Sequence, residues 1–263
     1  MGDQPDIAAY LERVGYAGSL APTPETLAAL VAAQLGSIPF ETLDGLTGAP
    51  PRADLANLQQ KLLYDRRGGS GIELNLLCGA MLADLDFQVA QHWAEVLFNG
   101  EDESCPTLRH RVLTVAVVGV GFLVDVGFGS LSPTVPLRLR AGLDQQTPQG
   151  RYRLVGGDPS FTLERERNGA WTPLYRFTPG QPAEPPTAED LALAPGLHVA
   201  KTDRAGVRFS IQGTTLSLEE PGGARRTERL SDLASLKDAL RTRFGIGLPP
   251  DETLDKALVP LFG

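Results

Sequence analysis

Residues 65–75 hold a turn that could support chemistry. The chain leaves a helical region there, passes through Gly68 and Gly69, and enters a new helix at about Gly71. The first N–H groups of a helix have no intrahelical partner and lie at the positive end of its dipole, so they can stabilise a developing negative charge. We therefore expect a functional site at this turn, with Ser70 capping the helix.

A histidine and an aspartate further along the chain could supply acid–base chemistry. If Asp125 accepts a hydrogen bond from one imidazole nitrogen of His110, it fixes the tautomer and leaves the other nitrogen free to act as a base. Gly127 and Gly129 follow the aspartate and allow a close backbone approach. The residues alone leave another interpretation open, in which His110 is a core histidine satisfied by any acceptor.

Composition excludes several classes of function. The chain has 263 residues, of which 42% are hydrophobic, so it can bury a sizeable core. A formal net charge of -8 and a pI near 5.0 disfavour nucleic acid as a partner. No apolar run is long enough for a membrane helix, and the N-terminus lacks signal-peptide features. Two cysteines form neither a disulfide framework nor a zinc motif, so we expect a cytoplasmic protein without a metal.

The hydrophobic periodicity divides the chain into helical and strand-rich parts. Helices are expected over residues 6–14, 24–35, 55–63 and 71–84, and the hydrophobic pattern changes after Leu85. Short strands and a hairpin at Gly119 then indicate a compact antiparallel barrel or sandwich. Expected strands cover residues 89–98, 111–118, 121–126, 152–155, 161–166, 171–177, 207–211 and 215–218, with an exposed connection at 179–194 and helices at 231–244 and 252–261.

Three segments, residues 37–44, 67–75 and 123–129, stand in an order and spacing that resemble arylamine N-acetyltransferases. His110 falls where that family has its histidine, and residues 244–248 are similar to the family's C-terminus. The resemblance implies an α+β fold with a cysteine-protease-like core. Its parts would be an N-terminal helical bundle (1–86), a central antiparallel β-barrel (87–195) and a C-terminal α/β lid (196–263).

The resemblance also implies roles for individual residues. The family transfers acyl groups from coenzyme A through a Cys-His-Asp triad, and His110 and Asp125 match its histidine and aspartate. Gly71 stands at the cysteine position, and Ser70 and Ile72 replace the flanking aromatic residues of the family pattern. Since glycine has no side chain, a covalent acyl-enzyme at this position is excluded and conventional ping-pong acetyl transfer should be absent.

Other positions of the motifs are expected to support the site. Glu41 and Arg67 match a family ion pair, which we expect to be bidentate and poorly solvated. Glu73 and Asn75 are interpreted as polar residues of the helix start, and Gly71 as extra space beside the retained base. The expected substrate pocket is lined by Phe40, Ile72, Gly127, Phe128 and Gly129.

No other residue is a convincing replacement nucleophile. The Ser70 side chain points about 100° away from position 71 on the helix, and it is better placed as a cap. Cys78 is expected to be a buried core thiol, and Cys105 lies on a loop before His110. His92 and His198 are expected to be satisfied locally rather than catalytic.

Residues 191–200 indicate which acyl donor the protein could bind. They are mostly apolar, whereas acetyltransferases of this type carry a segment there that is rich in Ser, Thr, His and Pro. This difference weakens the case for coenzyme A or another acyl thioester, and we expect no tightly bound cofactor. It also suggests a more apolar pocket for a larger substrate.

Three hypotheses follow. In the first, the His110–Asp125 pair is a general base for non-covalent acyl transfer, amide formation or cyclisation of a specialised-metabolite intermediate. The second is a catalytically inactive homologue that binds a small molecule or regulates an active paralogue. The third is a structural remnant whose cleft is filled by side chains such as Ile72 and Phe128. The expected partner is a small molecule, free, thioester-linked or carrier-protein-bound, and the chain is expected to be a monomer or homodimer.

Overall fold

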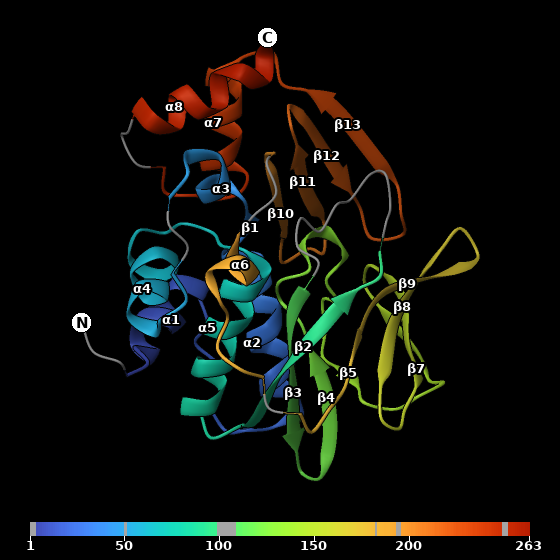
Figure 1. The fold of residues 1–263 in the computed structure, drawn as a ribbon. Coiled ribbons are helices and arrows are strands. Elements are labelled where there is room, and N and C mark those ends of the chain that lie inside the picture. The colour runs from blue at the N-terminus through green and yellow to red at the C-terminus, as the bar shows by residue number, and fades with distance from the viewer. Residues whose placement is uncertain (1–3, 50–51, 99–108, 182, 193–195, 249–251) are drawn as a thin grey trace.

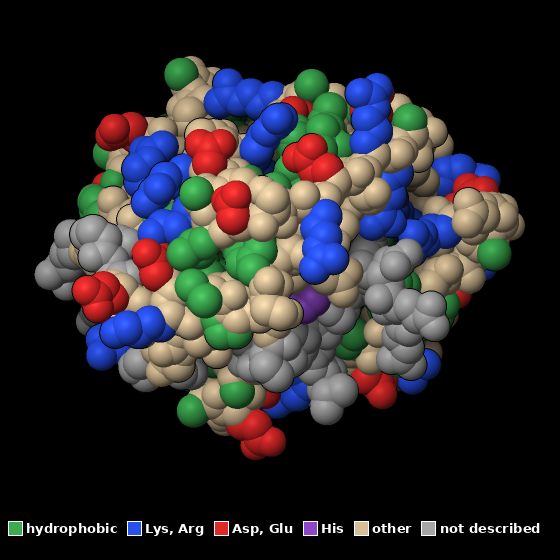
Figure 2. Space-filling view, turned by 90° about the horizontal axis from the view of Figure 1, so that it is seen from above, with side chains coloured by type: hydrophobic (Ala, Val, Ile, Leu, Met, Phe, Trp, Pro, Cys, Tyr) green, Lys and Arg blue, Asp and Glu red, His purple; other side chains and the backbone are tan. Residues whose placement is uncertain are grey.

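The computed structural model describes residues 4–49, 52–98, 109–181, 183–192, 196–248 and 252–263. Figure 1 shows helices from the first third of the chain beside a strongly curved sheet, with a second sheet and two helices above them. Basic and acidic side chains are interspersed over the upper face in Figure 2. None of the helices in the described residues is both long and apolar enough to span a bilayer.

The N-terminal region is helical, and its boundaries follow local chemistry. Thr23 caps α2 by accepting a hydrogen bond from the N–H of Thr26, and Pro24 occupies the first helical position. The helix ends at Ser37 because Ile38 precedes a proline and adopts an extended conformation. The first helices are α1 (Ile7–Val14), α2 (Pro24–Ser37), α3 (Leu43–Thr47) and α4 (Leu55–Gln59), with the short strand β1 (Phe40–Glu41) between α2 and α3.

The helix expected over residues 55–63 is not continuous. After α4 the chain widens into a π-helical turn, Gln60–Tyr64, which the hydrogen bond from Asp65 N–H to the Gln60 carbonyl closes. The next helix, α5 (Gly71–Asp84), matches its expected bounds. Its first turn lies against the curved sheet, so it positions the site.

The curved sheet contains eight antiparallel strands and nearly closes into a barrel. Successive residues of β3 face different cores: Val112 packs inside the barrel, whereas Leu113 and Val115 pack against the helices. In the order β5-β4-β3-β2-β9-β8-β7-β6, the strands are β2 (Gln88–Val96), β3 (Arg109–Val117), β4 (Val120–Val124), β5 (Leu137–Arg138), β6 (Asp144–Thr147), β7 (Gly150–Gly156), β8 (Phe161–Arg167) and β9 (Ala170–Phe177). The short β5 and β6 were not expected from the sequence.

The C-terminal part is a smaller sheet backed by helices. Strand β1 from the N-terminal region joins this sheet, because Phe40 and Glu41 pair with Ala200 and Val199 of β10. Helix α6 (Ala188–Leu191) precedes the sheet, whose order is β1-β10-β11-β12-β13. The strands are β10 (His198–Thr202), β11 (Arg208–Gln212), β12 (Thr215–Glu219) and β13 (Arg225–Arg229). The helices behind the sheet are α7 (Leu233–Thr242) and α8 (Glu252–Leu258), and a 3₁₀ turn, Val259–Phe262, follows α8.

Three hydrophobic cores correspond to the bundle with the outer barrel face, the barrel interior and the C-terminal sheet with its helices. The expected α+β architecture of bundle, barrel and lid is therefore confirmed. The boundaries at residues 86 and 195 stay predictions, and β1 crosses the first of them by pairing with the C-terminal sheet.

Candidate active site

Helix α5 begins with a complete capping box. The Ser70 hydroxyl accepts a hydrogen bond from the N–H of Glu73 at 3.3 Å, and the Glu73 carboxylate accepts from the N–H of Ser70 at 2.7 Å. Ser70 is therefore held as a cap, as its place in the sequence predicted. The backbone N–H groups of Ser70 and Glu73 are used in these two hydrogen bonds. An oxyanion at this turn could therefore accept hydrogen bonds only from the N–H groups of Gly71 and Ile72.

His110, on β3, and Asp125, directly after β4, form a buried pair. His110 Nε2 lies 3.0 Å from both carboxylate oxygens, and the two residues are 1% and 2% exposed. Because an ionised carboxylate can only accept, Nε2 donates to it, and in the neutral form of the imidazole Nδ1 carries the lone pair. The predicted hydrogen bond between the two side chains is confirmed.

Asp125 is held ionised by its surroundings. Burial by itself would raise the pKa of this carboxyl group, but the charge of His110 and hydrogen bonds from His110, Asn75 and the Gly127 N–H lower the pKa below its ordinary value. Asn75 Nδ2 donates to Asp125 Oδ1 at 2.8 Å, and the Gly127 N–H donates to the same oxygen at 2.9 Å. A histidine that acts as a base needs an ionised carboxylate in a fixed position beside it, and Asp125 provides one.

Aromatic rings fix the other faces of the imidazole. The rings of Phe128 and Tyr175 lie 5.0 Å and 5.5 Å from His110, centroid to centroid, and contact each other edge to face. Burial raises the pKa of Tyr175 well above its ordinary value, and the Asp125 charge raises it further. Tyr175 is therefore neutral and packs against the base without competing for its proton.

The free nitrogen of His110 faces position 71. A Cβ built on Gly71 would lie 3.0 Å from Nδ1 and 2.9 Å from Cε1 of His110. Within the residues that the structure describes, Nδ1 makes no hydrogen bond. The imidazole is thus aimed at the place where the motif pattern puts a thiol, although this chain has only a backbone there.

The expectation of extra space at Gly71 is wrong. The same Cβ would overlap with the carbonyl oxygen of Gly127, and a Cβ on Gly127 would lie 2.7 Å from the Cα of Gly71. Two glycines therefore bring their backbones into direct contact, because neither has a side chain to keep them apart. The volume that a side chain would fill is occupied by the turn after β4.

Five charged side chains form a network on the other side of the first turn of α5. Arg67 contacts Glu41 and Asp44 at 2.7 Å each, and Lys61 contacts Asp44 at 2.6 Å and Glu73 at 2.8 Å. Opposite charges raise the pKa of both Lys61 and Arg67 even though burial alone would lower it. The network holds three carboxylates and two cations, and each charge has a partner.

The predicted Glu41–Arg67 ion pair is present, but its geometry differs from the expected one. Nε and Nη2 of Arg67 both donate to Glu41 Oε1, at 3.0 Å and 2.7 Å. The second oxygen of Glu41 accepts from the Leu43 N–H at 2.6 Å, so it is not available for a two-oxygen contact. Asp44 and Lys61 complete the network and were not assigned from the sequence, because neither stands out from ordinary surface charges of a helix.

Asn75 connects the first turn of α5 to the histidine–aspartate pair. Its place in the sequence predicts a polar residue of the helix start, yet it is fully buried. Its Nδ2 donates to Asp125 Oδ1 and to the Arg111 carbonyl, both at 2.8 Å, and its Oδ1 accepts from the Val126 N–H at 3.0 Å. Its spacing of four from Gly71, one helical turn, was the available signal.

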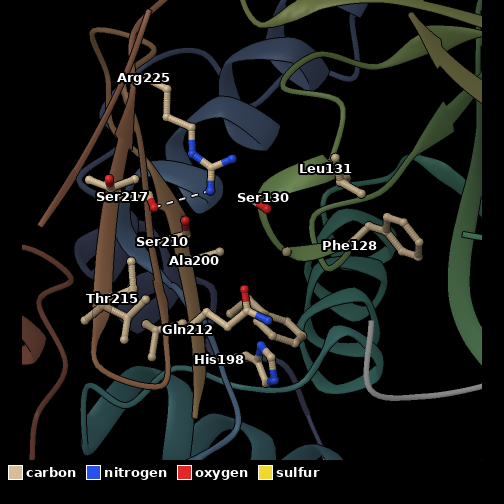
Figure 3. A pocket seen from close by; sticks show the side chains of 15 residues that line it. Phe128, Ser130, Leu131, His198, Ala200, Ser210, Gln212, Thr215, Ser217 and Arg225 are labelled. Carbon is tan, nitrogen blue, oxygen red and sulfur yellow. Dashed lines mark hydrogen bonds between the residues drawn. The ribbon is translucent and has the colours of Figure 1, made fainter. Parts of the chain in front are cut away.

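A cavity of about 550 Å³ opens beside this site, between the turn after β4 and the C-terminal sheet. Phe40, Phe128 and Gly129 line it as predicted, but Ile72, which is 1% exposed, and Gly127 do not. In Figure 3 the side chains of Gln212 and His198 extend from the sheet towards Phe128. The remaining lining residues are Ser130, Leu131, Val199, Ala200, Ser210, Ile211, Thr215, Ser217, Arg225 and Thr227.

The cavity is more polar than the sequence suggested. Residues 191–200 indicated an apolar wall, and Val199 and Ala200 do supply part of it. The same wall continues over β11, β12 and β13, where Arg225 donates to the Ser217 hydroxyl at 3.4 Å (Figure 3). Hydroxyl groups, an amide and a guanidinium therefore face the apolar floor, so the more apolar pocket expected for a larger substrate is not what the structure has.

Two other residues that were considered as catalytic candidates, Cys78 and His92, have surroundings that fit a structural role. Cys78 is 1% exposed in the helical core, and burial raises the pKa of its thiol to about 12, so it is not a thiolate. His92 contacts Thr114 Oγ1 at 2.8 Å, as a locally satisfied histidine would. Cys105 lies outside the described residues. Among those described, no three His, Cys, Asp or Glu side chains gather as they would around a metal ion.

The fold and the buried site together place the chain in a known class of transferases. The family model described as N-acetyltransferase matches residues 23–253. The arylamine N-acetyltransferase of Mycolicibacterium smegmatis is 39% identical over 262 residues, which cover 92% of each chain. The chain belongs to the arylamine N-acetyltransferase family, which confirms the resemblance found in the sequence.

Solved structures of this family are also similar to the chain. The structure of Mycobacterium marinum arylamine N-acetyltransferase in complex with CoA matches 97% of this chain and 99% of its own, with a TM-score of 0.87 and 32% identity. The arylamine N-acetyltransferase from Salmonella typhimurium matches 97% of this chain and 98% of its own, with a TM-score of 0.87 and 29% identity. Nearly all of this chain is thus similar to these two structures.

Proposed function

We propose that this chain transfers an acyl group directly from a bound acyl thioester to an acceptor, with His110 as the general base and Asp125 as the residue that orients it. One observation carries the proposal. His110 Nδ1, which has a lone pair in the neutral imidazole, makes no hydrogen bond within the described residues and lies 3.0 Å from where a Cβ on residue 71 would be. A base held in this way can receive a proton from any N–H or O–H group that takes the place of the missing thiol.

The proposed step needs no covalent intermediate. Nδ1 removes a proton from the acceptor, the acceptor attacks the thioester carbonyl, and the thiol leaves after taking up the proton. The N–H groups of Gly71 and Ile72, at the first turn of α5, are the donors available to the developing oxyanion. An intramolecular acceptor would make the same step an amide-forming cyclisation of a specialised-metabolite intermediate.

The cavity beside Phe128 suits the acyl donor. A pantetheine-type thioester carries amides, a hydroxyl and phosphate at one end and an apolar acyl group at the other. Arg225 and the hydroxyls of Ser210, Thr215 and Ser217 can bind the polar end, and Phe40 and Leu131 can contact the acyl group. The relative from M. marinum was solved with CoA, which supports a coenzyme A or carrier-protein thioester as a substrate rather than a tightly bound cofactor.

The proposal requires one movement. His110 is 1% exposed, and the Gly127 carbonyl lies where the acceptor must approach. The turn at residues 127–129 therefore has to move away from Gly71 when substrate binds. Gly129 adopts a φ of 59°, and Gly127 has no side chain, so both positions suit a turn that changes conformation.

The test compares single-turnover acyl transfer by the natural chain and by His110→Ala, with a panel of acyl thioesters and amine or hydroxyl acceptors. We expect the variant to lose about 10²- to 10⁴-fold in rate, the usual contribution of a general base. Intact-mass analysis in the same assay should show no acyl adduct on either protein. Unchanged turnover by His110→Ala, or an adduct on Ser70, Cys78 or Cys105, would contradict the proposal.

A second candidate function is ligand binding without turnover, in a homologue that has lost catalysis. The direct contact between Gly71 and Gly127 favours it, because this contact closes the path to the base. It predicts that thioesters bind in the cavity with the same affinity in His110→Ala and that no transfer occurs with any acceptor. A structural remnant with a filled cleft fits less well, because the cavity measures about 550 Å³.

A further inference from the structure

Arg111 is a buried cation that the acyl-transfer site does not use. It follows His110 on β3, is 1% exposed, and stacks on the ring of Trp93 with its guanidinium carbon 4.2 Å from the ring centroid. Nη2 donates to the carbonyl of Glu184 at 2.8 Å, whereas Nε and Nη1 are buried without a hydrogen-bond partner among the described residues. Two nitrogen atoms of one charged group therefore have no partner there, which is costly in a protein interior.

No carboxylate forms an ion pair with Arg111 within the part of the chain that the structure describes, although the charge of Asp190 acts to raise its pKa. Arg109, the closest charged neighbour on the strand, stacks on the same tryptophan at 4.0 Å and pairs with Asp190 at 2.7 Å. Burial lowers the pKa of Arg111 to about 10, and the positive charge of Arg109 also lowers it. A buried guanidinium normally has an anionic partner, as Arg67 has in Glu41.

A second cavity of about 550 Å³ lies at Arg111. Its walls are Leu76 of α5, Ala90 of β2, and the segment that carries Pro185 and Pro186, with His92 and Gln91 at the sheet. It shares no lining residue with the cavity at Phe128. A mostly apolar chamber with one unsatisfied guanidinium matches a ligand with an apolar body and a single anionic head.

We propose that this cavity binds a small apolar carboxylate, whose head pairs with Nη1 and Nη2 of Arg111. These two groups present parallel N–H bonds at the end of the guanidinium, and a carboxylate can accept both once Nη2 has released the Glu184 carbonyl. Since these atoms are covered, the segment 183–186 has to lift when the ligand enters. Lifting this segment breaks the hydrogen bond from Arg111 Nη2 to the Glu184 carbonyl, which the ligand head replaces, and neither Pro185 nor Pro186 has an N–H group that would hold the segment in place.

This site would communicate with the histidine–aspartate pair by a short route. Asn75 Nδ2 donates both to the carbonyl of Arg111 and to the carboxylate of Asp125. A shift of Arg111 on ligand binding therefore reaches Asp125 through one side chain. The binding itself does not depend on acyl transfer, and its test needs no substrate.

The experiment uses octanoate as the probe and octanamide as its neutral counterpart, because the two differ only in the head group. The chain has two tryptophans, Trp93 and Trp171, so a Trp171→Phe background leaves Trp93 as the reporter beside Arg111. Titrations follow Trp93 fluorescence and, independently, the heat of binding by calorimetry. Inorganic phosphate is titrated in a parallel arm.

We expect octanoate to bind at least about tenfold more tightly than octanamide, since two hydrogen bonds to a charged group contribute that much or more. Arg111→Met, which keeps the length of the side chain and removes the charge, should weaken octanoate binding by at least about tenfold. Arg109→Gln is the matched control, because it removes a cation from the same tryptophan, and it should retain binding within about threefold. Urea unfolding shows that each variant is folded.

Several results would overturn the proposal. Equal binding of octanoate to Arg111→Met and the unmodified background would show that Arg111 is not the contact. Loss of binding in Arg225→Gln instead would place the probe in the cavity at Phe128. Phosphate binding without octanoate binding would exclude an apolar ligand, and no binding of octanoate at millimolar concentration would exclude the site.

Discussion

Two polar networks meet the first turn of α5 from opposite sides, and they differ in what they leave unsatisfied. On one side, Glu41, Asp44 and Glu73 are paired with Lys61 and Arg67. On the other, Asp125 is fully engaged by His110, Asn75 and a backbone N–H, but the second nitrogen of His110 has no hydrogen bond in the described residues. A closed network can only hold structure, whereas an open one retains an atom for chemistry.

Both networks are present around a glycine. Gly71 lies between them, and the atoms nearest to a Cβ built on it belong to the Gly127 carbonyl and the His110 ring. The first turn of α5 is therefore supported on both sides although position 71 has no side chain. The following changes test whether the two sides differ as described, beginning with the largest expected effect.

Breaking the closed network should cost the most stability. Arg67→Ala leaves Glu41 buried and without its partner, and truncating one member of a buried ion pair typically lowers the free energy of unfolding by about 3–5 kcal/mol. Urea denaturation followed by circular dichroism measures it. Arg151→Ala removes an arginine from an exposed pair with Asp144 and serves as the control, with no resolvable change. A similar small effect for both variants would mean that the network is not structural.

Restoring a side chain at position 71 should have an intermediate effect. Alanine favours a helix over glycine by about 1 kcal/mol at most. The overlap of its Cβ with the Gly127 carbonyl should cost about 1–3 kcal/mol, so Gly71→Ala should be less stable overall. Gly48→Ala would not be a fair control because its φ is 70°, but Gly36→Ala, inside α2 with contacts no closer than 3.6 Å, is. A more stable Gly71→Ala protein would refute the backbone contact.

The smallest effect concerns acid stability. The pKa of Asp125 in the folded chain lies below its ordinary value of 3.8, so the unfolded chain takes up the proton first as the pH falls. Asp125 therefore stabilises the fold fully above its unfolded pKa, and this contribution is lost as the pH falls through the folded pKa. Urea midpoints between pH 2 and pH 6 should decline more steeply for the natural chain than for Asp125→Asn. Parallel curves would show that Asp125 is not held ionised by its neighbours.

Local signals predicted much of the fold. Thr23 and Pro24 marked the start of α2, and Ser70 with Glu73 marked the start of α5, because caps depend on residues three positions apart. Motif order then brought His110 and Asp125 together correctly. Each of these features depends on short spacing or on a pattern shared with the family.

Features that depend on tertiary contact were missed. The Gly127 carbonyl fills the space at Gly71 only because β4 ends where it does against α5, which no local pattern reveals. The polar wall of the cavity comes from Ser210, Thr215 and Ser217, on strands whose pairing decides which side they face. Arg111 was passed over because an arginine in a strand is usually at the surface.

The pairing of β1 with β10 also constrains how the protein can be made. The Thr42 hydroxyl donates to the Gly196 carbonyl across 154 positions, and Phe40 and Glu41 pair with Ala200 and Val199, which are even further away in sequence. A ribosome must therefore synthesise about three quarters of the chain before the wall that closes the cavity can begin to assemble. Until then, the two-residue strand at Phe40 has an open edge, so nascent chains should depend on a chaperone there longer than at any capped helix of the bundle.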